Sequence, residues 1–354
     1  MKILFISRAY PPIVGGIENQ NFELGSWLSK IAEVKIIANR YGKIFLPIFL
    51  PYSIIRALFL IRKYDAILLG DGVLSIVGWK LKFFTKKPVF CVVHGLDITY
   101  QDWLFQKFWV GFFLRKMDRL IAVGNETIRA GMGKGIPENK FIFIPNGVDE
   151  KKCRGDFQRE DLHGILKENL GNKKIILTSG RLVKRKGVAW FIREVMPRLP
   201  ENFHYVIAGD GPDREDIVKA IAEKNLSSRV DILGYVTDKI RNILFNTADV
   251  FVQPNIKIVN DMEGFGISVI EANACERVVL ASNLEGLKDA IKDGENGFLL
   301  ESENAEAWVE KIKEVLSDDV FRNEFGGKAR EFVQNNYSWK KISKSYLEEI
   351  NKLI

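Results

Sequence analysis

The chain has 354 residues and a formal net charge of +7, with 47% hydrophobic and 27% charged residues. This length suits two domains of ordinary size, and the composition excludes a mainly disordered protein, except for a connecting segment near residues 150–172. Three widely separated cysteines, Cys91, Cys153 and Cys275, form no CxxC motif, which argues against a disulfide framework or a structural zinc site and favours a reducing cytosol.

The positive charge is concentrated in the first part of the chain. Residues 1–147 carry 20 Lys and Arg against 10 Asp and Glu, whereas the rest carries 32 against 35. A basic half of this kind favours an anionic surface or an anionic acceptor as its partner. Nucleic acid is the weaker candidate, because no zinc-finger spacing or RNP-like motif accompanies the charge.

The chain begins with an unalternating apolar run, Lys2 to Ser7, which is typical of a buried parallel strand and is interrupted by Arg8 too early for a signal peptide. Gly15-Gly16 and a helix to about Leu28 follow. Strand, glycine loop and helix can present backbone N–H groups to a phosphate, although a tight turn without a ligand fits the same residues. The chain has no GxGxxG and no GxxxxGK[ST] motif, which weighs against a dehydrogenase and an ATPase.

Residues 44–61 form an apolar run nearly long enough to span a membrane. Pro47, Pro51 and Arg56 argue against a span, and a core helix preceded by a loop is the favoured interpretation. Aromatic residues mix with Lys and Arg here and in residues 79–87 and 103–109. That mixture suits peripheral contact of the N-terminal domain with an anionic membrane surface, although buried aromatics with exposed lysines explain each segment singly.

Further short apolar runs alternate with helical stretches, which predicts a doubly wound α/β sheet. His94 directly follows one of the runs, Val89 to Val93, and residues at the carboxyl ends of parallel strands line ligand crevices. We therefore expect His94 to be functional rather than structural. The predicted strands of this half are residues 2–7, 34–38, 66–69, 89–93, 120–123 and 141–144.

The same alternation restarts after the connecting segment and predicts a second α/β domain. Gly180 ends the strand 175–179, and Arg181 and Lys186 in the loop after it offer two cations to a diphosphate; a solvated charge run is the alternative. The later strands are predicted at residues 205–208, 230–233, 250–253 and 278–281, and a last helix at Trp339 to Leu353.

The segment from Asp261 to Glu271 joins two carboxylates and two glycines to a predicted short buried helix, Ile267 to Ala274. Glu263 precedes this helix and Glu271 lies on it. A fully helical segment would separate the two carboxylates by about 12 Å, at about 1.5 Å per residue, and a loop folded back would separate them by somewhat less. That spacing is too wide for an acid and base pair. It suits two carboxylates that grip one extended ligand around N–H groups near Phe265, Gly266 and Ile267; a glycine-rich loop with a surface Glu is the other interpretation.

Six motifs occur in order along the chain: Pro11-Pro12 with Gly15-Gly16-Ile17-Glu18, His94-Gly95-Leu96-Asp97, Pro145-Asn146-Gly147-Val148-Asp149, Gly180-Arg181-Leu182 with Lys186-Gly187, Gly209-Asp210-Gly211-Pro212, and Glu263 through Glu271. Taken together, these motifs resemble family 4 glycosyltransferases of the GT-B fold over nearly the whole chain. The resemblance implies an α/β protein of two Rossmann-like domains with parallel sheets that face each other across a central cleft. The expected boundaries are 1–165 for the acceptor-side domain and 166–337 for the donor-binding domain, with a helix near 338–354 that can return to the first domain.

The resemblance also implies an activity, a retaining and metal-independent transfer of a hexose-type sugar from a nucleoside-diphosphate donor, with no further cofactor. Arg181 and Lys186 would hold the diphosphate, with Gly15, Gly16 and Gly180 allowing close approach of the backbone. Glu263 would bind the donor sugar and His94 would lie near the reacting centre. Phe265, Gly266 and Ile267 would offer N–H groups, Glu271 would bind the ribose, and Val236 would face the base.

The expected acceptor is a hydroxyl of a lipid-linked or other cell-envelope glycan or glycolipid. The expected location is the cytoplasm, including the inner face of the plasma membrane. A sugar-nucleotide epimerase, a phosphorylase and a catalytically silent sugar-nucleotide-binding protein are the alternatives on the same fold. One departure is Gly124-Asn125, where relatives commonly carry Ser after Val, so a side-chain contact at that point is in doubt.

Overall fold

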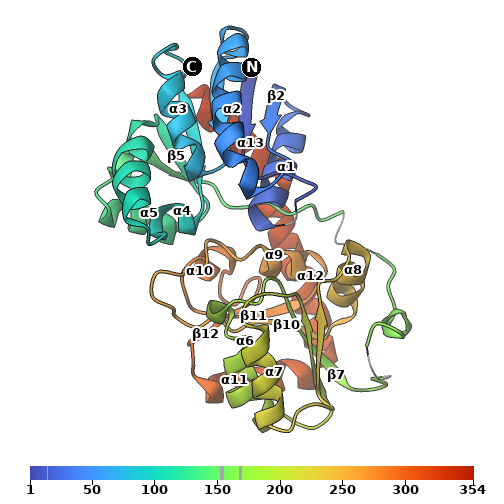
Figure 1. Cartoon of the computed structure of the whole chain (residues 1–354). Coiled ribbons are helices and arrows are strands. Elements are labelled where there is room, and N and C mark those ends of the chain that lie inside the picture. The colour runs from blue at the N-terminus through green and yellow to red at the C-terminus, as the bar shows by residue number, and fades with distance from the viewer. Residues whose placement is uncertain (14, 152–154, 167–169) are drawn as a thin grey trace. The chain divides into compact units, whose positions relative to one another are not determined.

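The computed structural model describes residues 1–13, 15–151, 155–166 and 170–354. Most of the polypeptide forms two six-stranded, wholly parallel sheets, each with helices on both faces (Figure 1). The two predicted Rossmann-like domains are therefore confirmed, whereas their facing across a cleft stays a prediction. Parts of the predicted connecting segment, residues 152–154 with Cys153 and residues 167–169, lie outside the described residues, as does residue 14 in the first glycine motif.

The first sheet has the strand order β2-β1-β3-β4-β5-β6. Its strands agree with the predicted ones to within one residue at each end. They are β1 (Lys2–Ser7), β2 (Glu33–Ala38), β3 (Ala66–Leu69), β4 (Val89–Val93), β5 (Arg119–Ala122) and β6 (Phe141–Phe143). Their helices are α1 (Gly16–Leu28), α2 (Leu46–Leu60), α3 (Ser75–Leu81), α4 (Gly95–Thr99), α5 (Asn125–Gly133) and α13 (Trp339–Asn351), with a π-helix at Phe105–Phe113 and short 3-10 turns at Lys43–Phe45, Ile61–Lys63, Gly72–Leu74, Leu114–Lys116 and Glu138–Lys140.

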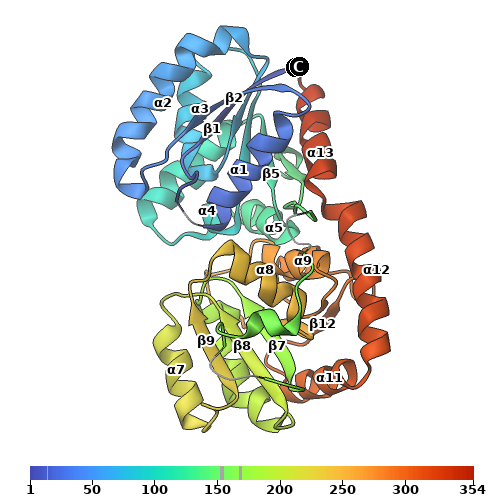
Figure 2. The same ribbon diagram turned by 90° about the vertical axis from the view of Figure 1, so that its right-hand side faces the viewer.

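Crossovers between parallel strands are right-handed, so the strand order decides which face each helix covers. The chain moves one way from β1 to β2 and the other way from β2 to β3, which puts α1 and α2 on opposite faces of the sheet (Figure 2). The later connections all continue in the direction of β3, and therefore α3 and the π-helix share the face of α2. The helix α13 packs beside α1 on the other face.

The helix α2 differs from its expected role as a core helix. Only Phe49, Ser53 and Ala57 are buried in it, although an 18-residue window within Lys43–Lys63 has a mean hydropathy of 2.1. Together with the 3-10 turns at its two ends, α2 forms the helical span Lys43–Lys63. Within the described residues this span is the one helix long and apolar enough to cross a membrane, and 22% of its apolar window is buried. Its buried side packs on α3 and β1, so the core interpretation holds for one face of the helix and not for the other.

The second sheet has the order β12-β11-β10-β7-β8-β9. The short strand β12 is an element that the sequence did not indicate. The strands are β7 (Lys174–Ser179), β8 (Phe203–Ala208), β9 (Val230–Gly234), β10 (Val250–Gln253), β11 (Val278–Ser282) and β12 (Phe298–Leu300). The helices are α6 (Val188–Trp190), α7 (Arg214–Glu223), α8 (Asp238–Thr247), α9 (Ile267–Ala274), α10 (Leu287–Ala290), α11 (Ala305–Ser317) and α12 (Asp319–Tyr337), with a π-helix at Phe191–Val195 and 3-10 turns at Arg159–Leu162, Lys184–Lys186 and Met196–Arg198.

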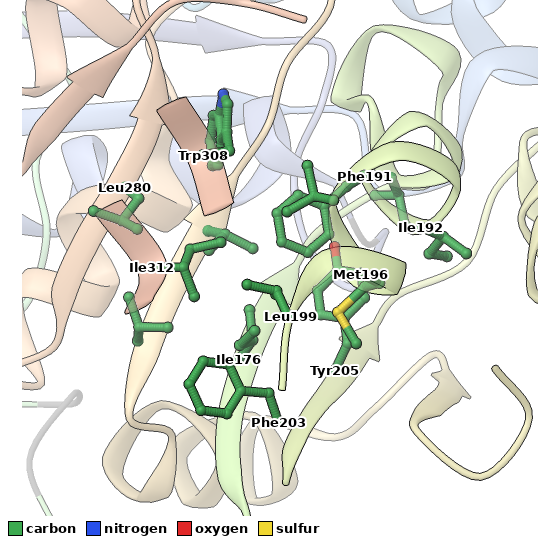
Figure 3. Packing of buried hydrophobic residues seen from close by; sticks show 14 of the residues in the cluster. Ile176, Phe191, Ile192, Met196, Leu199, Phe203, Tyr205, Leu280, Trp308 and Ile312 are labelled. Atoms are coloured by element: carbon green, nitrogen blue, oxygen red, sulfur yellow. The ribbon is translucent and has the colours of Figure 1, made fainter. Parts of the chain in front are cut away.

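One face of the second sheet carries a large aromatic and aliphatic core (Figure 3). Phe191 packs against both Tyr205 and Trp308, with ring centroids 4.9 and 5.9 Å apart. All three side chains are fully buried. This cluster fixes the π-helix and α11 on β7 and β8, and so it holds the loop that follows β7 on a rigid base.

The boundary between the two compact units lies earlier in the chain than the predicted boundary at 165. The first comprises Met1–Gly147, Asn260–Phe265 and Trp339–Ile354, and the second comprises Val148–Val259 and Gly266–Ser338. The N–H of Val148 donates to the carbonyl of Tyr337 at 2.8 Å, which ties the chain after Gly147 to the second unit. A Cβ on Gly147 would lie 2.5 Å from the ring of Trp339, so α13 packs closely on the first unit.

Candidate functional site

The two strand orders locate the crevice of each sheet. In an open parallel sheet, ligands bind beyond the carboxyl ends of the strands, at the point where the strand order reverses. That point lies between β1 and β3 in the first unit and between β7 and β10 in the second. The loops that leave these four strands are therefore the places to look for binding groups.

At the first reversal point a buried ion pair joins the two loops. The guanidinium Nε of Arg8, after β1, lies 2.8 Å from Oδ1 of Asp71, after β3. Asp71 also accepts a hydrogen bond from the N–H of Val73, whereas its Oδ2 has no hydrogen-bond partner among the described residues. Burial raises the pKa of Asp71, and the nearby guanidinium of Arg8 opposes this rise. Sequence analysis gave neither residue a role, although both stand at strand ends.

His94 follows β4 in the first unit, as predicted, and is 9% exposed. Its Nε2 lies 3.4 Å from the carbonyl of Gly70, and its backbone N–H donates to Oδ2 of Asp97 at 2.9 Å. The same carboxylate oxygen accepts from the N–H of Gly72 at 3.2 Å. Asp97 thus ties the loop after β3 to the start of α4 and positions His94, a function that the sequence motif did not reveal.

Gly15 and Gly16 lie where the predicted glycine loop meets α1. Gly16 is the first residue of the helix, and a Cβ placed on it would meet none of the described atoms within 4 Å. A Cβ on Gly15 would instead lie 2.2 Å from the carboxylate of Glu18. The space over Gly16 is therefore open, and the carboxylate of Glu18 folds over the neighbouring glycine.

In the second unit the loop between β7 and α6 is held by backbone contacts on two sides. Gly180 donates its N–H to the carbonyl of Ala208, and Leu182 donates to Asp210, both in the stretch that ends β8 and follows it. On the other side, Ile256 donates its N–H to the carbonyl of Arg185 at 2.9 Å. The loop is thus anchored to the segments after both neighbouring strands, β8 and β10.

Two glycines in this loop adopt special backbone conformations, and one of them makes a close contact. Gly187 has φ +65° and a Cβ on it would lie 1.9 Å from the carbonyl oxygen of Pro254. Gly180 has φ +142° with open space around it. Both conformations are ones that residues with a side chain rarely adopt. The glycines therefore fix the path that carries the cations past the carboxyl end of β7.

Arg181 and Lys186 both lie in this anchored loop at the second reversal point. Arg181 is exposed, and Lys186 is partly buried at the end of the 3-10 turn Lys184–Lys186. Both cations thus lie past the end of β7, which is between β8 and β10 at the middle of the sheet. Their contact with a diphosphate stays a prediction.

Gly266 caps α9 in the left-handed conformation, with φ 89° and ψ 60°, and Ile267 begins the helix as predicted. Ser268 in the first turn donates its hydroxyl to Oε1 of Gln253 at the end of β10, at 2.7 Å. The N-terminus of α9 is thereby fixed next to the same strand end that holds Pro254 and the β7 loop. It presents backbone N–H groups, which favour an anion, toward this region.

Glu271 lies on α9 and its side chain is 12% exposed. Burial raises its pKa, and the guanidinium of Arg241 on α8, 3.4 Å away, opposes this rise. Arg241 was absent from the sequence-based site. A pairing between α8 and α9 could not be read from residues 30 positions apart.

Val236 is partly buried in the loop after β9, two strands from β7. Neighbouring strands are about 4.8 Å apart, so this loop begins about 10 Å from the cationic loop. Tyr235 beside it is 69% exposed. The cationic loop and the loop after β9 therefore follow each other along the sheet edge in the order that a diphosphate and its nucleoside require. The role of Val236 stays a prediction.

Glu263 and Phe265 fall in the short stretch Asn260–Phe265, which belongs to the first unit, whereas Gly266, Ile267 and Glu271 belong to the second. Both side chains are buried, with exposures of 8% and 1%. A Cβ on Gly95, next to His94, would lie 3.0 Å from the side chain of Met262. The stretch that carries Glu263 therefore packs beside the loop that carries His94, and the predicted clamp is divided between the two units.

Other chemistry is sparse in the part of the chain that the structure describes. There, no group of three or more His, Cys, Asp and Glu side chains is arranged to hold a metal ion. Cys91 and Cys275 are buried free thiols.

Comparison with known families finds two matches that divide the chain. Residues 14–152 match the model of glycosyltransferase family 4, and residues 160–332 match the model of glycosyl transferases group 1. An uncharacterized glycosyltransferase of Methanocaldococcus jannaschii is 27% identical, over 97% of this chain and 96% of the relative. A capsular polysaccharide biosynthesis glycosyltransferase of Staphylococcus aureus is 25% identical over 83% of this chain and 80% of its own length.

A third relative and a solved structure complete the comparison. The N,N'-diacetylbacillosaminyl-diphospho-undecaprenol alpha-1,3-N-acetylgalactosaminyltransferase of Campylobacter jejuni is 28% identical over 75% of this chain and 70% of its own length. The structure of Anabaena HepE in complex with UDP-glucose covers all of both chains with a TM-score of 0.80 and 19% identity. At that identity the likeness establishes the fold.

Proposed function

Since the chain belongs to the family 4 glycosyltransferases of the GT-B fold, we propose that it moves a hexose-type sugar from a nucleoside diphosphate to a hydroxyl of a cell-envelope or lipid-linked glycan, with retention at the anomeric carbon. The observation that carries the proposal is the anchored loop Gly180–Gly187. It holds Arg181 and Lys186 at the reversal point of the second sheet, beside the N-terminus of α9.

In the proposed reaction, negative charge develops on the leaving diphosphate. The bond between the anomeric carbon and the phosphate oxygen breaks, and a bond from the acceptor oxygen forms on the same face of the sugar. The leaving phosphate oxygen takes the acceptor proton. Arg181 and Lys186 stabilise the charge that grows on the diphosphate, so that no metal ion is required for this role. His94 and Glu263 act on the sugar, and Glu271 acts on the ribose.

The proposed acceptor class and location follow the relatives. The Staphylococcus aureus protein is named for capsular polysaccharide biosynthesis, and the Campylobacter jejuni protein for an acceptor linked through diphosphate to undecaprenol. We place the reaction of this chain in the cytoplasm, where nucleotide sugars serve as donors, with a cell-envelope glycan as the acceptor.

A thermal-shift screen of nucleoside diphosphates and their sugars tests the donor site, because a ligand that binds the folded state raises its unfolding temperature. We expect at least one nucleoside diphosphate to raise that temperature, and Lys186→Ala to reduce the rise. Lys184→Ala is the matched control, because Lys184 lies in the same 3-10 turn and has no assigned role. Equal shifts in Lys186→Ala and in the wild type would refute the diphosphate contact.

A second assay separates transfer from the other reactions on this fold. With the identified donor, a glycosyltransferase releases free nucleoside diphosphate in proportion to the acceptor added. An epimerase changes the donor sugar without releasing the nucleotide, a phosphorylase forms a sugar phosphate, and a silent binding protein gives a thermal shift without turnover.

A further inference from the structure

A basic hollow of about 320 Å³ lies in the first unit, where the edge strand β2 meets α2. Lys35 on β2, Arg40 just after it and Arg56 on α2 line it, together with Tyr10 and Tyr52. Neither the mechanism nor the sequence motifs use this hollow. Three cations around one space of this size call for an anionic ligand.

The cations of the hollow have no acidic partners among the residues that the structure describes. Among the described residues no Asp or Glu lines the hollow, and none of the ion pairs involves Lys35, Arg40 or Arg56. The guanidinium of Arg40 lies 5.7 Å from the ring of Tyr10. Cations that are close together and unpaired repel one another. A bound phosphate would offset this repulsion by accepting charge-assisted hydrogen bonds from them.

Next to the hollow, α2 carries an unpartnered apolar stripe. Residues 44, 48, 52, 55 and 59 are three or four positions apart, so they share a single face. This face runs from the 3-10 turn before α2 into the helix. They are exposed to extents that are rare for such side chains in water: Ile44 89%, Ile48 68%, Tyr52 53%, Ile55 57% and Phe59 77%. Tyr52 belongs both to this stripe and to the lining of the hollow.

The charges around the stripe identify what covers it. Helix α3 packs on α2, and the π-helix packs on α3, so all three share one face of the first sheet (Figure 2). Residues 43–63, 79–87 and 103–116 of this layer contain 11 Lys and Arg and no Asp or Glu. The layer also exposes Phe83, Phe84, Trp103 and Phe108. Exposed apolar side chains among cations complement an anionic lipid surface.

The hollow is connected to the proposed reaction centre along the sheet edge. Asn39, after β2, donates through Nδ2 to the carbonyl of Arg8 at 3.2 Å, and Arg8 pairs with Asp71. Asp97 then links the loop after β3 to His94. From β2 to β4 is three strand spacings, about 14 Å. An acceptor with its phosphate in the hollow can therefore extend a sugar toward His94.

From these observations we propose that the hollow binds the phosphate or diphosphate group of a lipid-linked acceptor, while the stripe on α2 lies in the membrane that holds its lipid chain. This rests on the proposed function and deepens it, because it names the acceptor as a lipid diphosphate. The enzyme takes such an acceptor from the membrane surface, with the phosphate at α2 and the accepting hydroxyl near His94.

The test measures binding of the full chain to three kinds of vesicle: phosphatidylcholine alone, phosphatidylcholine with polyprenyl diphosphate, and phosphatidylcholine with phosphatidylglycerol. We expect the tightest binding to the polyprenyl diphosphate vesicles. Arg40→Gln/Arg56→Gln should lose that preference, with binding about tenfold or more weaker, since a lost charge-assisted hydrogen bond has this size. Both arginines are exposed, so the fold should tolerate the change, and circular dichroism checks it.

Two further variants separate the hollow from the membrane surface. Lys86→Gln/Lys107→Gln removes the same charge from exposed positions outside the hollow, and should weaken binding to both anionic vesicles alike while keeping the preference for diphosphate. Ile48→Ser/Phe59→Ser should lose vesicle binding and keep binding to a soluble short-chain prenyl diphosphate.

Three results would overturn the proposal. Equal binding of the wild type to the two anionic vesicles would assign the surface to phospholipid headgroups in general. An undiminished diphosphate preference in Arg40→Gln/Arg56→Gln would show that the hollow does not bind the diphosphate. Undiminished vesicle binding of Ile48→Ser/Phe59→Ser would show that the stripe does not contact the membrane. The nucleoside diphosphate thermal shift reports on the second unit, so failure of the proposed function would be seen there separately.

Discussion

Substitution of Gly187 by alanine tests whether the loop after β7 needs its close contact with the segment after β10. Gly187 has φ +65°, and an added Cβ would lie 1.9 Å from the carbonyl oxygen of Pro254. A left-handed conformation costs a residue with a side chain about 1–2 kcal/mol. The overlap with backbone adds about 1–3 kcal/mol, because either the loop or Pro254 must shift. We therefore expect Gly187→Ala to lower the free energy of unfolding by about 2–5 kcal/mol.

Gly294→Ala is the matched control for this substitution. Gly294 has φ +77°, and a Cβ on it would meet none of the described atoms within 4 Å. Only the conformational part, about 1–2 kcal/mol, should then remain. Urea unfolding of both variants measures the difference, and the thermal shift with a nucleoside diphosphate shows whether the displaced loop still binds the ligand. Equal destabilisation of the two variants would refute the reasoning, as would a full ligand shift in Gly187→Ala.

Other substitutions test single groups of the site. Arg181→Ala and Lys186→Ala should each slow turnover by an amount equivalent to about 2–4 kcal/mol, and near-normal rates in a steady-state assay would remove their role at the diphosphate. Arg8→Met should cost about 3–5 kcal/mol in urea unfolding, because it leaves the buried Asp71 unpaired, and adding Asp71→Asn should recover much of the loss; no recovery would contradict this cause. The pKa of Glu271 is raised from 4.5, so its contribution to stability is present below that pH and is lost as the pH rises through the folded value. Glu271→Gln should accordingly gain unfolding temperature relative to the wild type as the pH rises above 4.5, and a constant difference would argue against the raised pKa.

The architecture could be read from the sequence because buried parallel strands leave a strong local signal. Runs such as Ala66–Leu69 and Val89–Val93 are apolar without alternation, and the structure has these strands with the same bounds. The helix Ile267–Ala274 was equally well marked, by Gly266 ahead of it. The three-residue strand Phe298–Leu300 was missed, because so short a run does not differ from an apolar turn.

The sequence also predicted that several site residues lie at strand ends. His94, Arg181 and Lys186 lie where the sequence put them, just past β4 and β7. In a parallel sheet every strand ends at the same edge, so sequence order alone locates a residue at that edge. The sequence did not show Arg8 with Asp71, or Glu271 with Arg241, since each pair joins loops or helices that are brought together only by the strand order and helix packing.

The exposed face of α2 is another feature that the sequence did not predict. Its apolar sequence predicted a core helix, and its buried positions are Phe49, Ser53 and Ala57 alone. Hydropathy records what a side chain prefers and does not record whether a neighbour is present to cover it. The sequence by itself determined two Rossmann-like units and the edge at which their chemistry lies, because both follow from local patterns repeated along the chain. Only the tertiary structure decided which charges meet and which apolar face remains open, because these depend on strand order and on the packing of segments far apart in the sequence.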